Sequence, residues 1–138
     1  MLDEQYRNLF AIIARNGAIN GENALEMAKN EGQNKISENS IASTEVMIEN
    51  FRKLEDKISL GKEPLTGLDY VFLYVGAIVS KELITKSIEK MRFVVNEYEN
   101  NILPALKTVA QMSDEDDKDR DTMIIELIGE RMNEILEK

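Results

Sequence analysis

Cysteine and histidine are both absent from the 138-residue sequence. Their absence excludes disulfides, zinc sites built on thiolate or imidazole, Ser-His-Asp and Cys-His nucleophile systems, and the Glu-x-x-His pairs of di-iron helical bundles. A glycine-rich phosphate loop is also missing, because the segment 17–21 has no Lys-Ser/Thr after it and no strand before it. We therefore predict a protein that is not an enzyme and that holds no cofactor or metal.

The sequence also has no long hydrophobic run. Its longest apolar stretch, Tyr70 to Val79, is far shorter than the roughly 20 residues that span a bilayer. The N-terminal residues are acidic where a signal peptide is basic. Because nothing indicates an oxidising compartment either, we predict a cytoplasmic protein that does not bind a membrane.

Positive charge is scarce, since 17 Lys and Arg face 26 Asp and Glu, which gives a net charge of -9. This balance argues against direct nucleic-acid binding, which needs clustered basic residues. Residues 113–138 hold ten acidic and four basic side chains. These acids either keep the chain soluble or form a surface that binds a basic partner. The candidate residues for that acidic surface are Asp114, Glu115, Asp116, Asp117, Asp119 and Asp121.

Hydrophobic residues recur at spacings of three and four along most of the chain, which is typical of helices that bury one face. Apolar residues make up 43% of the sequence, an ordinary fraction for a folded protein, and the length fits one domain over residues 1–138. We predict an all-α bundle of about five helices built around one long central helix. The Lys-, Asn- and Ile-rich composition points to a bacterial or phage source.

The first half of the chain is expected to form three helices. Residues 3–15 predict the first, which Asn16-Gly17 ends, with a loop over 16–21 and a short second helix over 22–31. Residues 38–60 predict a third helix. Its buried stripe is Met47, Phe51, Leu54 and Ile58.

The central helix is predicted from residue 67 to about residue 100. Thr66 and Asp69 have the spacing of a capping box at its start, and Leu65 can pack on Tyr70 as a hydrophobic staple. Residues 70–79 are apolar nearly all round, as expected of a helix surrounded by others. The glycine at position 76 and that at position 129 lie inside predicted helices, and we interpret them as places where helix backbones approach closely.

The second half of this helix narrows to an apolar stripe at four-three spacing. A helix of some 33 residues is about 50 Å long, so the 38–60 helix cannot cover it. The stripe therefore needs a partner: the last helix is its natural cover within the chain, and we also predict that the stripe forms a homodimer interface. Its residues are Ile84, Ile88, Met91, Val95, Tyr98 and Ile102.

Two features near the C-terminus leave the structure open. Pro104 either kinks the long helix or lies in the first turn of a new helix capped near Asn101. The last helix begins at about Ser113 or Asp121 and runs to Leu136, with an acidic run that suits the positive end of the helix dipole.

Two classes of function remain compatible with this sequence. The first is a non-catalytic interaction protein, such as an adaptor, inhibitor or immunity-type regulator, that acts as a homodimer or on a basic partner. In a narrower version, its carboxylates imitate nucleic-acid phosphates. The second is a magnesium-dependent all-α hydrolase with clustered Glu and Asp, which would require four or more acids converging inside the bundle. The run at 114–121 is not an EF-hand, because it lacks the sixth-position glycine and the twelfth-position glutamate.

Overall fold

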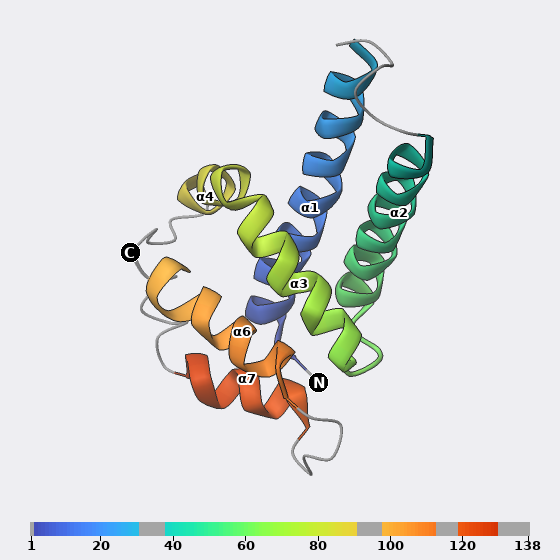
Figure 1. Cartoon of the computed structure of the whole chain (residues 1–138). Helices are drawn as coiled ribbons and strands as arrows, with labels where there is room; N and C mark the ends of the chain where they lie inside the picture. The colour runs from blue at the N-terminus through green and yellow to red at the C-terminus, as the bar shows by residue number, and fades with distance from the viewer. Residues whose placement is uncertain (1, 31–37, 91–97, 113–118, 130–138) are drawn as a thin grey trace.

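The computed structural model describes the backbone of residues 2–30, 38–90, 98–112 and 119–129. Within these residues it contains six α-helices and a π-helical turn (Figure 1). The prediction of an all-α helical bundle is confirmed. The elements are α1 (Glu4–Asn30), α2 (Glu38–Leu60), α3 (Gly67–Val79), α4 (Lys81–Lys90), η1 (Tyr98–Ile102), α6 (Leu103–Ala110) and α7 (Arg120–Ile128).

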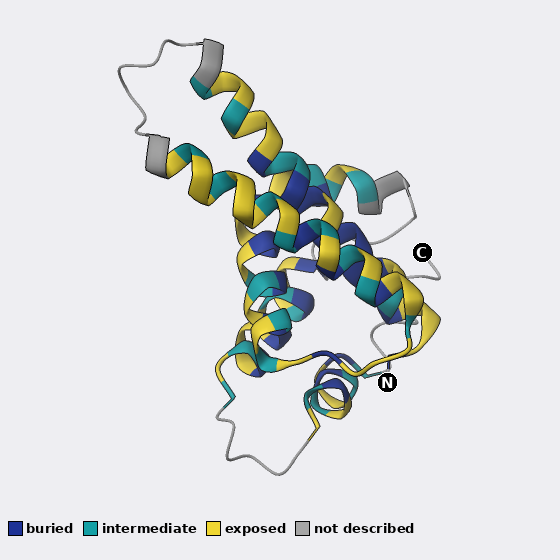
Figure 2. Cartoon of the chain, turned by 90° about the vertical axis from the view of Figure 1, so that its right-hand side faces the viewer, coloured by how far each residue is buried: buried dark blue, intermediate teal, exposed yellow. Residues whose placement is uncertain are grey.

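The helices form two parts that share α1. The helices α1 and α2 pair lengthwise, from Arg7 beside Ser59 to Gly21 beside Ile48, whereas α3 crosses the N-terminal half of α1 and carries α6, which in turn contacts α7 (Figure 1). Buried residues gather where these helices cross, and the far ends of the α1–α2 pair are mostly exposed (Figure 2). The main core therefore lies between α1, α2, α3, α6 and α7, and α4 and η1 also contribute buried residues to it. Of the described helices, none is long and apolar enough to span a membrane, and the cytoplasmic location stays a prediction.

The helix α1 is continuous, so the loop predicted at residues 16–21 is wrong. A Cβ atom at Gly17 would lie 2.7 Å from the ring of Phe51, and one at Gly21 would lie 2.7 Å from Cγ1 of Ile48. The two glycines are therefore not a helix stop. They lie one turn apart and let α2 approach α1 closely, and this packing overrides their low helix propensity.

The prediction of a helix over residues 38–60 is confirmed as α2, whose Phe51, Leu54 and Ile58 are buried and whose Met47 is partly exposed. The ring of Phe51 also meets α3. A Cβ atom at Gly76 would lie 2.9 Å from Phe51 Cε1 and 3.6 Å from the main-chain oxygen of Ile13. Gly76 therefore has the close-approach role inferred from the sequence.

The long central helix is broken at Ser80, so the prediction of one helix from 67 to 100 is wrong. Ser80 is buried, and its hydroxyl donates a hydrogen bond to the main-chain oxygen of Asn16 in α1, at 3.0 Å. Its backbone leaves helical geometry at φ -109° and ψ 18°. The chain turns there, and α4 begins in a new direction (Figure 1).

Pro104 lies in the first turn of α6, which is the second of the two predicted alternatives. The residue before the helix is Ile102 instead of Asn101, and it makes no side-chain cap. The π-helical turn η1 leads directly into α6. Because proline has no amide to donate, the first turn of a helix is the place that tolerates it best.

The last described helix begins at the later of the two predicted starts. Asp119 caps α7 by accepting a hydrogen bond from the backbone of Asp121, at 3.0 Å. Gly129 ends α7 with φ 52°, so its predicted place inside a helix is wrong. The acidic run 114–117 and the predicted continuation to Leu136 lie outside the described residues.

Candidate interaction surface

The three residues of the predicted homodimer stripe whose side chains the structure describes belong to the protein's own core. Ile84 is fully buried, and Tyr98 and Ile102 are 1% exposed. The phenol of Tyr98 donates a hydrogen bond to the main-chain oxygen of Ala77 in α3, at 3.1 Å. Because the chain bends at Ser80 and returns as η1 and α6, these side chains lie in the core of the same chain and are not available to a second copy. Met91, Val95 and the side chain of Ile88 lie outside the described residues.

The predicted acidic surface is also corrected at one position. Asp121 is 1% exposed and therefore does not belong to a surface, whereas Asp119 is exposed as the cap of α7. Asp114, Glu115, Asp116 and Asp117 lie outside the described residues.

Asp121 joins α7 to the start of α3. Its carboxylate accepts a hydrogen bond from the Tyr70 hydroxyl at 2.6 Å and one from the backbone of Leu65 at 3.4 Å. Burial raises the pKa of Asp121 above its ordinary value, and the two hydrogen bonds oppose that rise. Burial and the neighbouring carboxylate also raise the pKa of Tyr70, so it remains a neutral donor. A buried pair with satisfied partners fixes geometry, and we interpret this one as structural.

The beginning of α3 is fixed by the predicted capping box. The Thr66 hydroxyl accepts a hydrogen bond from the backbone of Asp69 at 3.2 Å, and the Asp69 carboxylate accepts one from the backbone of Thr66 at 2.9 Å. Leu65 and Tyr70, the predicted staple pair, are both buried in the core. The first turn of α3 is thus held by its own cap, by Asp121 and by the core.

One side of α3 is in the core and the other faces solvent. The buried residues of this helix are Tyr70, Leu73, Gly76 and Ala77. The outward residues are also apolar, and their exposed fractions lie between 38% and 65%. We call these outward residues the α3 face: Leu68, Val71, Val75, Ile78 and Val79.

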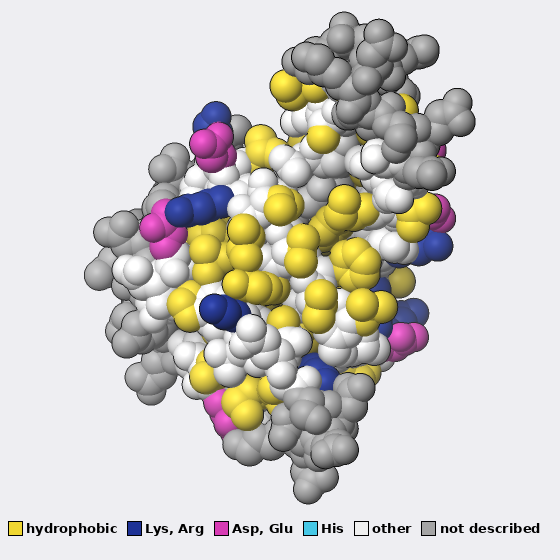
Figure 3. Space-filling view, viewed as in Figure 1, with side chains coloured by type: hydrophobic (Ala, Val, Ile, Leu, Met, Phe, Trp, Pro, Cys, Tyr) yellow, Lys and Arg dark blue, Asp and Glu magenta, His cyan; other side chains and the backbone are white. Residues whose placement is uncertain are grey.

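The α3 face is the centre of an apolar surface. In Figure 3 hydrophobic side chains gather over α3, and most of the charged side chains lie toward the rim. No charged residue occurs between Asp69 and Lys81. The charges at its two ends are paired within the chain, since Lys57 contacts Asp69 at 2.7 Å and Lys81 contacts Glu99 at 3.0 Å. A contiguous apolar surface with a polar rim is typical of a protein-interaction site.

A groove of about 200 Å³ lies beside the N-terminal half of α3. Leu68 and Phe72 form its α3 wall, and Lys53, Leu54 and Lys57 belong to its α2 wall. Asn50 and Asp69 also line the groove, so at Leu68 the α3 face meets a mainly polar border on the side of α2.

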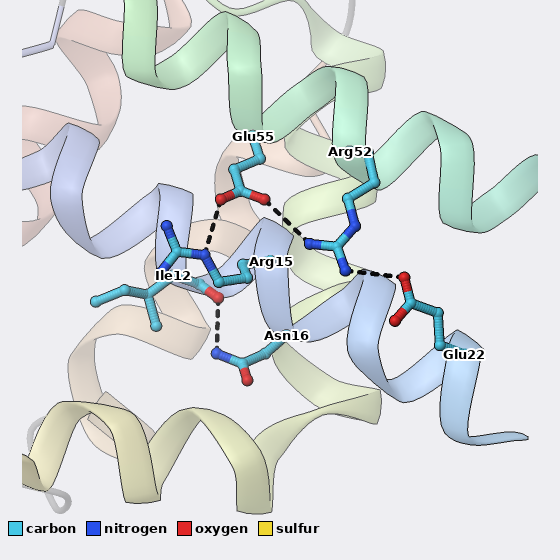
Figure 4. A network of polar contacts seen from close by, with 6 residues as sticks. All are labelled: Ile12, Arg15, Asn16, Glu22, Arg52 and Glu55. Carbon is cyan, nitrogen blue, oxygen red and sulfur yellow. Dashed lines mark hydrogen bonds and ion pairs between the residues drawn. The ribbon is translucent and has the colours of Figure 1, made fainter.

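The ion pairs between α1 and α2 orient these two helices and do not form a binding site. Figure 4 shows the Glu55 carboxylate between Arg15 and Arg52, at 2.8 and 3.4 Å, while Arg52 also reaches Glu22 at 2.8 Å. These groups are at least partly exposed, and such pairs contribute little stability, on the order of 0–1 kcal/mol each. They fix the orientation of the two helices and leave no unpaired cluster that could bind a ligand.

No group of three or more acidic side chains that could hold a metal ion occurs in the part of the chain that the structure describes. The convergence of acids that a magnesium-dependent hydrolase would need is therefore not found among these residues.

The α3 face is not identified from the sequence, because a helix that is apolar on nearly all sides predicts burial by other helices on every side. The spacing of Leu68, Val71, Val75 and Ile78 was a usable signal, since it repeats as regularly as the buried stripe. Comparison of the chain with protein-family models, with curated proteins and with solved structures gives no match.

Proposed function

We propose that this protein is a non-catalytic interaction module that binds another protein chain through the α3 face. The observation that supports this proposal is the row of exposed apolar side chains on α3, which is uninterrupted by charge from position 70 to position 80. Soluble proteins rarely leave large contiguous apolar patches open unless a partner covers them.

The way α3 is held agrees with such a role. A docking surface binds best when its geometry is fixed before the partner arrives, because less conformational entropy is then lost. The capping box at Thr66, the Asp121 contact with Tyr70 and the packing of Gly76 against α1 and α2 all fix α3 from its inner side. The outer side chains are left free to make contacts.

The α3 face replaces the homodimer interface predicted at residues 84–102, of which the described side chains are mainly core. A basic partner on the acidic C-terminal segment stays a prediction, because residues 114–117 lie outside the described part. No cluster of described acids favours the magnesium-dependent hydrolase.

Site-specific photocrosslinking tests the proposal. A benzoylphenylalanine at Val75 is compared with one at Leu127 in α7, since these two positions are similarly exposed at 38% and 42%. Illumination in the host cell should give a discrete crosslinked protein product from position 75 and markedly less from position 127. Equal or absent products at the two positions would contradict the proposed function.

A further inference from the structure

We propose that the partner of the α3 face is a second copy of this chain, whose α3 packs antiparallel across a two-fold axis. This inference rests on the proposed function and names the occupant of the same surface. Two properties of α3 support it, the order of its outward side chains and the absence of charge from the α3 face, and its length sets the expected strength of the dimer.

The outward side chains of α3 have the same spacing when the helix is followed from either end. Leu68, Val71, Val75 and Ile78 are spaced by three, four and three residues. When two such helices run antiparallel about an axis at position 73, Leu68 faces the partner's Ile78 and Val71 faces the partner's Val75. Each layer then pairs side chains of similar size, and every contact occurs twice, as a closed two-fold interface requires.

The α3 face is also a place where two acidic copies can meet. The whole chain has a net charge of -9, so two copies repel each other over most approaches. The α3 face itself has no charge, and the ion pairs at its ends, Lys57 with Asp69 and Lys81 with Glu99, are closed within one chain. A second copy docked here therefore confronts no unbalanced like charge.

The length of α3 indicates a weak dimer. Its 13 residues extend over about 20 Å. A single pair of helices of this length lies at the small end of specific interfaces, where transient association is common. We therefore expect the monomer and the dimer to exchange at micromolar concentrations, on the order of 10–100 μM.

Sedimentation equilibrium of the purified full chain over a concentration series measures this association. Val75→Glu would place a carboxylate next to the two-fold axis, close to its own symmetry copy, and should weaken dimerisation at least tenfold. Leu127→Glu adds the same charge at a similarly exposed site and should leave dimerisation within about twofold. A wild-type chain that stays monomeric, or a dimer that Val75→Glu leaves intact, would overturn the inference.

The absence of cysteine allows the register to be tested by disulfide pairing. Val71→Cys and Val75→Cys chains are mixed and oxidised. The antiparallel arrangement places position 71 in one layer with the partner's position 75 and shifts identical positions by about 6 Å along the axis. In an equimolar mixture, random pairing would make the mixed disulfide about twice as abundant as each matched disulfide, so the antiparallel arrangement should give an excess well above that ratio. A parallel arrangement would favour the matched disulfides instead and overturn the proposed geometry.

Thiol reactivity separates failure of the inference from failure of the proposed function. In dilute solution Val75→Cys should react with a thiol reagent as fast as Leu127→Cys, and the reaction should slow as the concentration rises. A monomer that reacts rapidly at every concentration would overturn the second copy as partner but leave the face open to another protein. A monomer that reacts slowly would overturn both, since the chain itself would then cover the face.

Discussion

The side chain of Phe51 in α2 packs against two other helices, α1 and α3. Its ring lies between Gly17 of α1 and Gly76 of α3, at distances that leave no room for a Cβ atom on either glycine. A Cβ atom added at one of these glycines would push the ring toward the helix that carries the other glycine. The two glycines therefore belong to one packing unit, although they are far apart in the sequence.

Gly17→Ala should destabilise the protein even though alanine favours helix. Overpacking costs about 1–3 kcal/mol, and the gain in helix propensity is only about 1 kcal/mol. We expect the free energy of unfolding in urea to fall by about 1 kcal/mol. In a Phe51→Leu background the smaller side chain leaves room, and the same change should be neutral or stabilising. Equal effects in both backgrounds would show that Phe51 is not what Gly17 accommodates.

Asp121 should make the stability of the protein depend on pH in an unusual direction. Its pKa is raised in the folded state by burial, so the folded protein binds a proton more tightly than the unfolded chain. This contribution to stability is complete below the unfolded pKa, near 4, and is lost as pH rises through the higher folded pKa.

Asp121→Asn cannot titrate and should lose this dependence. Urea unfolding of the two proteins from about pH 3.5 to pH 7 gives the comparison. The stability of Asp121→Asn relative to the wild type should improve as pH rises over this interval. A difference that stays constant or changes in the opposite direction would mean that the carboxylate is ionised as readily in the folded state as in the unfolded chain.

At the scale of elements, a prediction from the sequence is correct where neighbouring residues determine the structure and wrong where distant residues determine it. The capping box at Thr66 and the helix over residues 38–60 depend on signals that are complete within a few turns, and both predictions are confirmed, although Met47 of the predicted buried stripe is 37% exposed. The loop at 16–21 and the unbroken helix after 67 are wrong because distant side chains decide both places. The ring of Phe51 in α2 packs against Gly17, and the main-chain oxygen of Asn16 accepts a hydrogen bond from the hydroxyl of Ser80.

Ser80→Ala tests the tertiary origin of the bend between α3 and α4. It removes a buried hydrogen bond from Ser80 to α1 and should lower the free energy of unfolding by about 1 kcal/mol. Ser87→Ala is the matched control, because the Ser87 hydroxyl bonds only to Leu83 within α4. The control should be neutral or slightly stabilising, since alanine favours helix. Similar changes in both variants would assign the bend to local sequence instead.

At the scale of the whole molecule, the bend at Ser80 is also the reason that the candidate surface lies on α3 and not at residues 84–102. The apolar stripe at 84–102 needs a cover, for which the sequence offers the last helix and a second chain. The chain instead returns as η1 and α6, so Ile84, Tyr98 and Ile102 are buried within one copy. The first half of the expected helix was predicted to be surrounded, but α3 has one covered and one open side, and it is Ile84, Tyr98 and Ile102 of the second half that are buried. Sequence periodicity identifies apolar faces but does not state which neighbour covers them.

Salt dependence should reveal how the whole molecule balances apolar attraction against charge. Two copies with a net charge of -9 repel each other, and the Debye length shortens from about 30 Å at 0.01 M salt to about 10 Å at 0.1 M. The apolar α3 contact is not weakened by such screening. The dissociation constant from sedimentation should therefore decrease, by roughly threefold or more, as sodium chloride rises over this interval. Val75→Glu should need more salt than the wild type to reach the same association. Association that weakens with salt would instead indicate ion pairs across the interface, which the paired ends of α3 do not offer, and would place the contact on another surface.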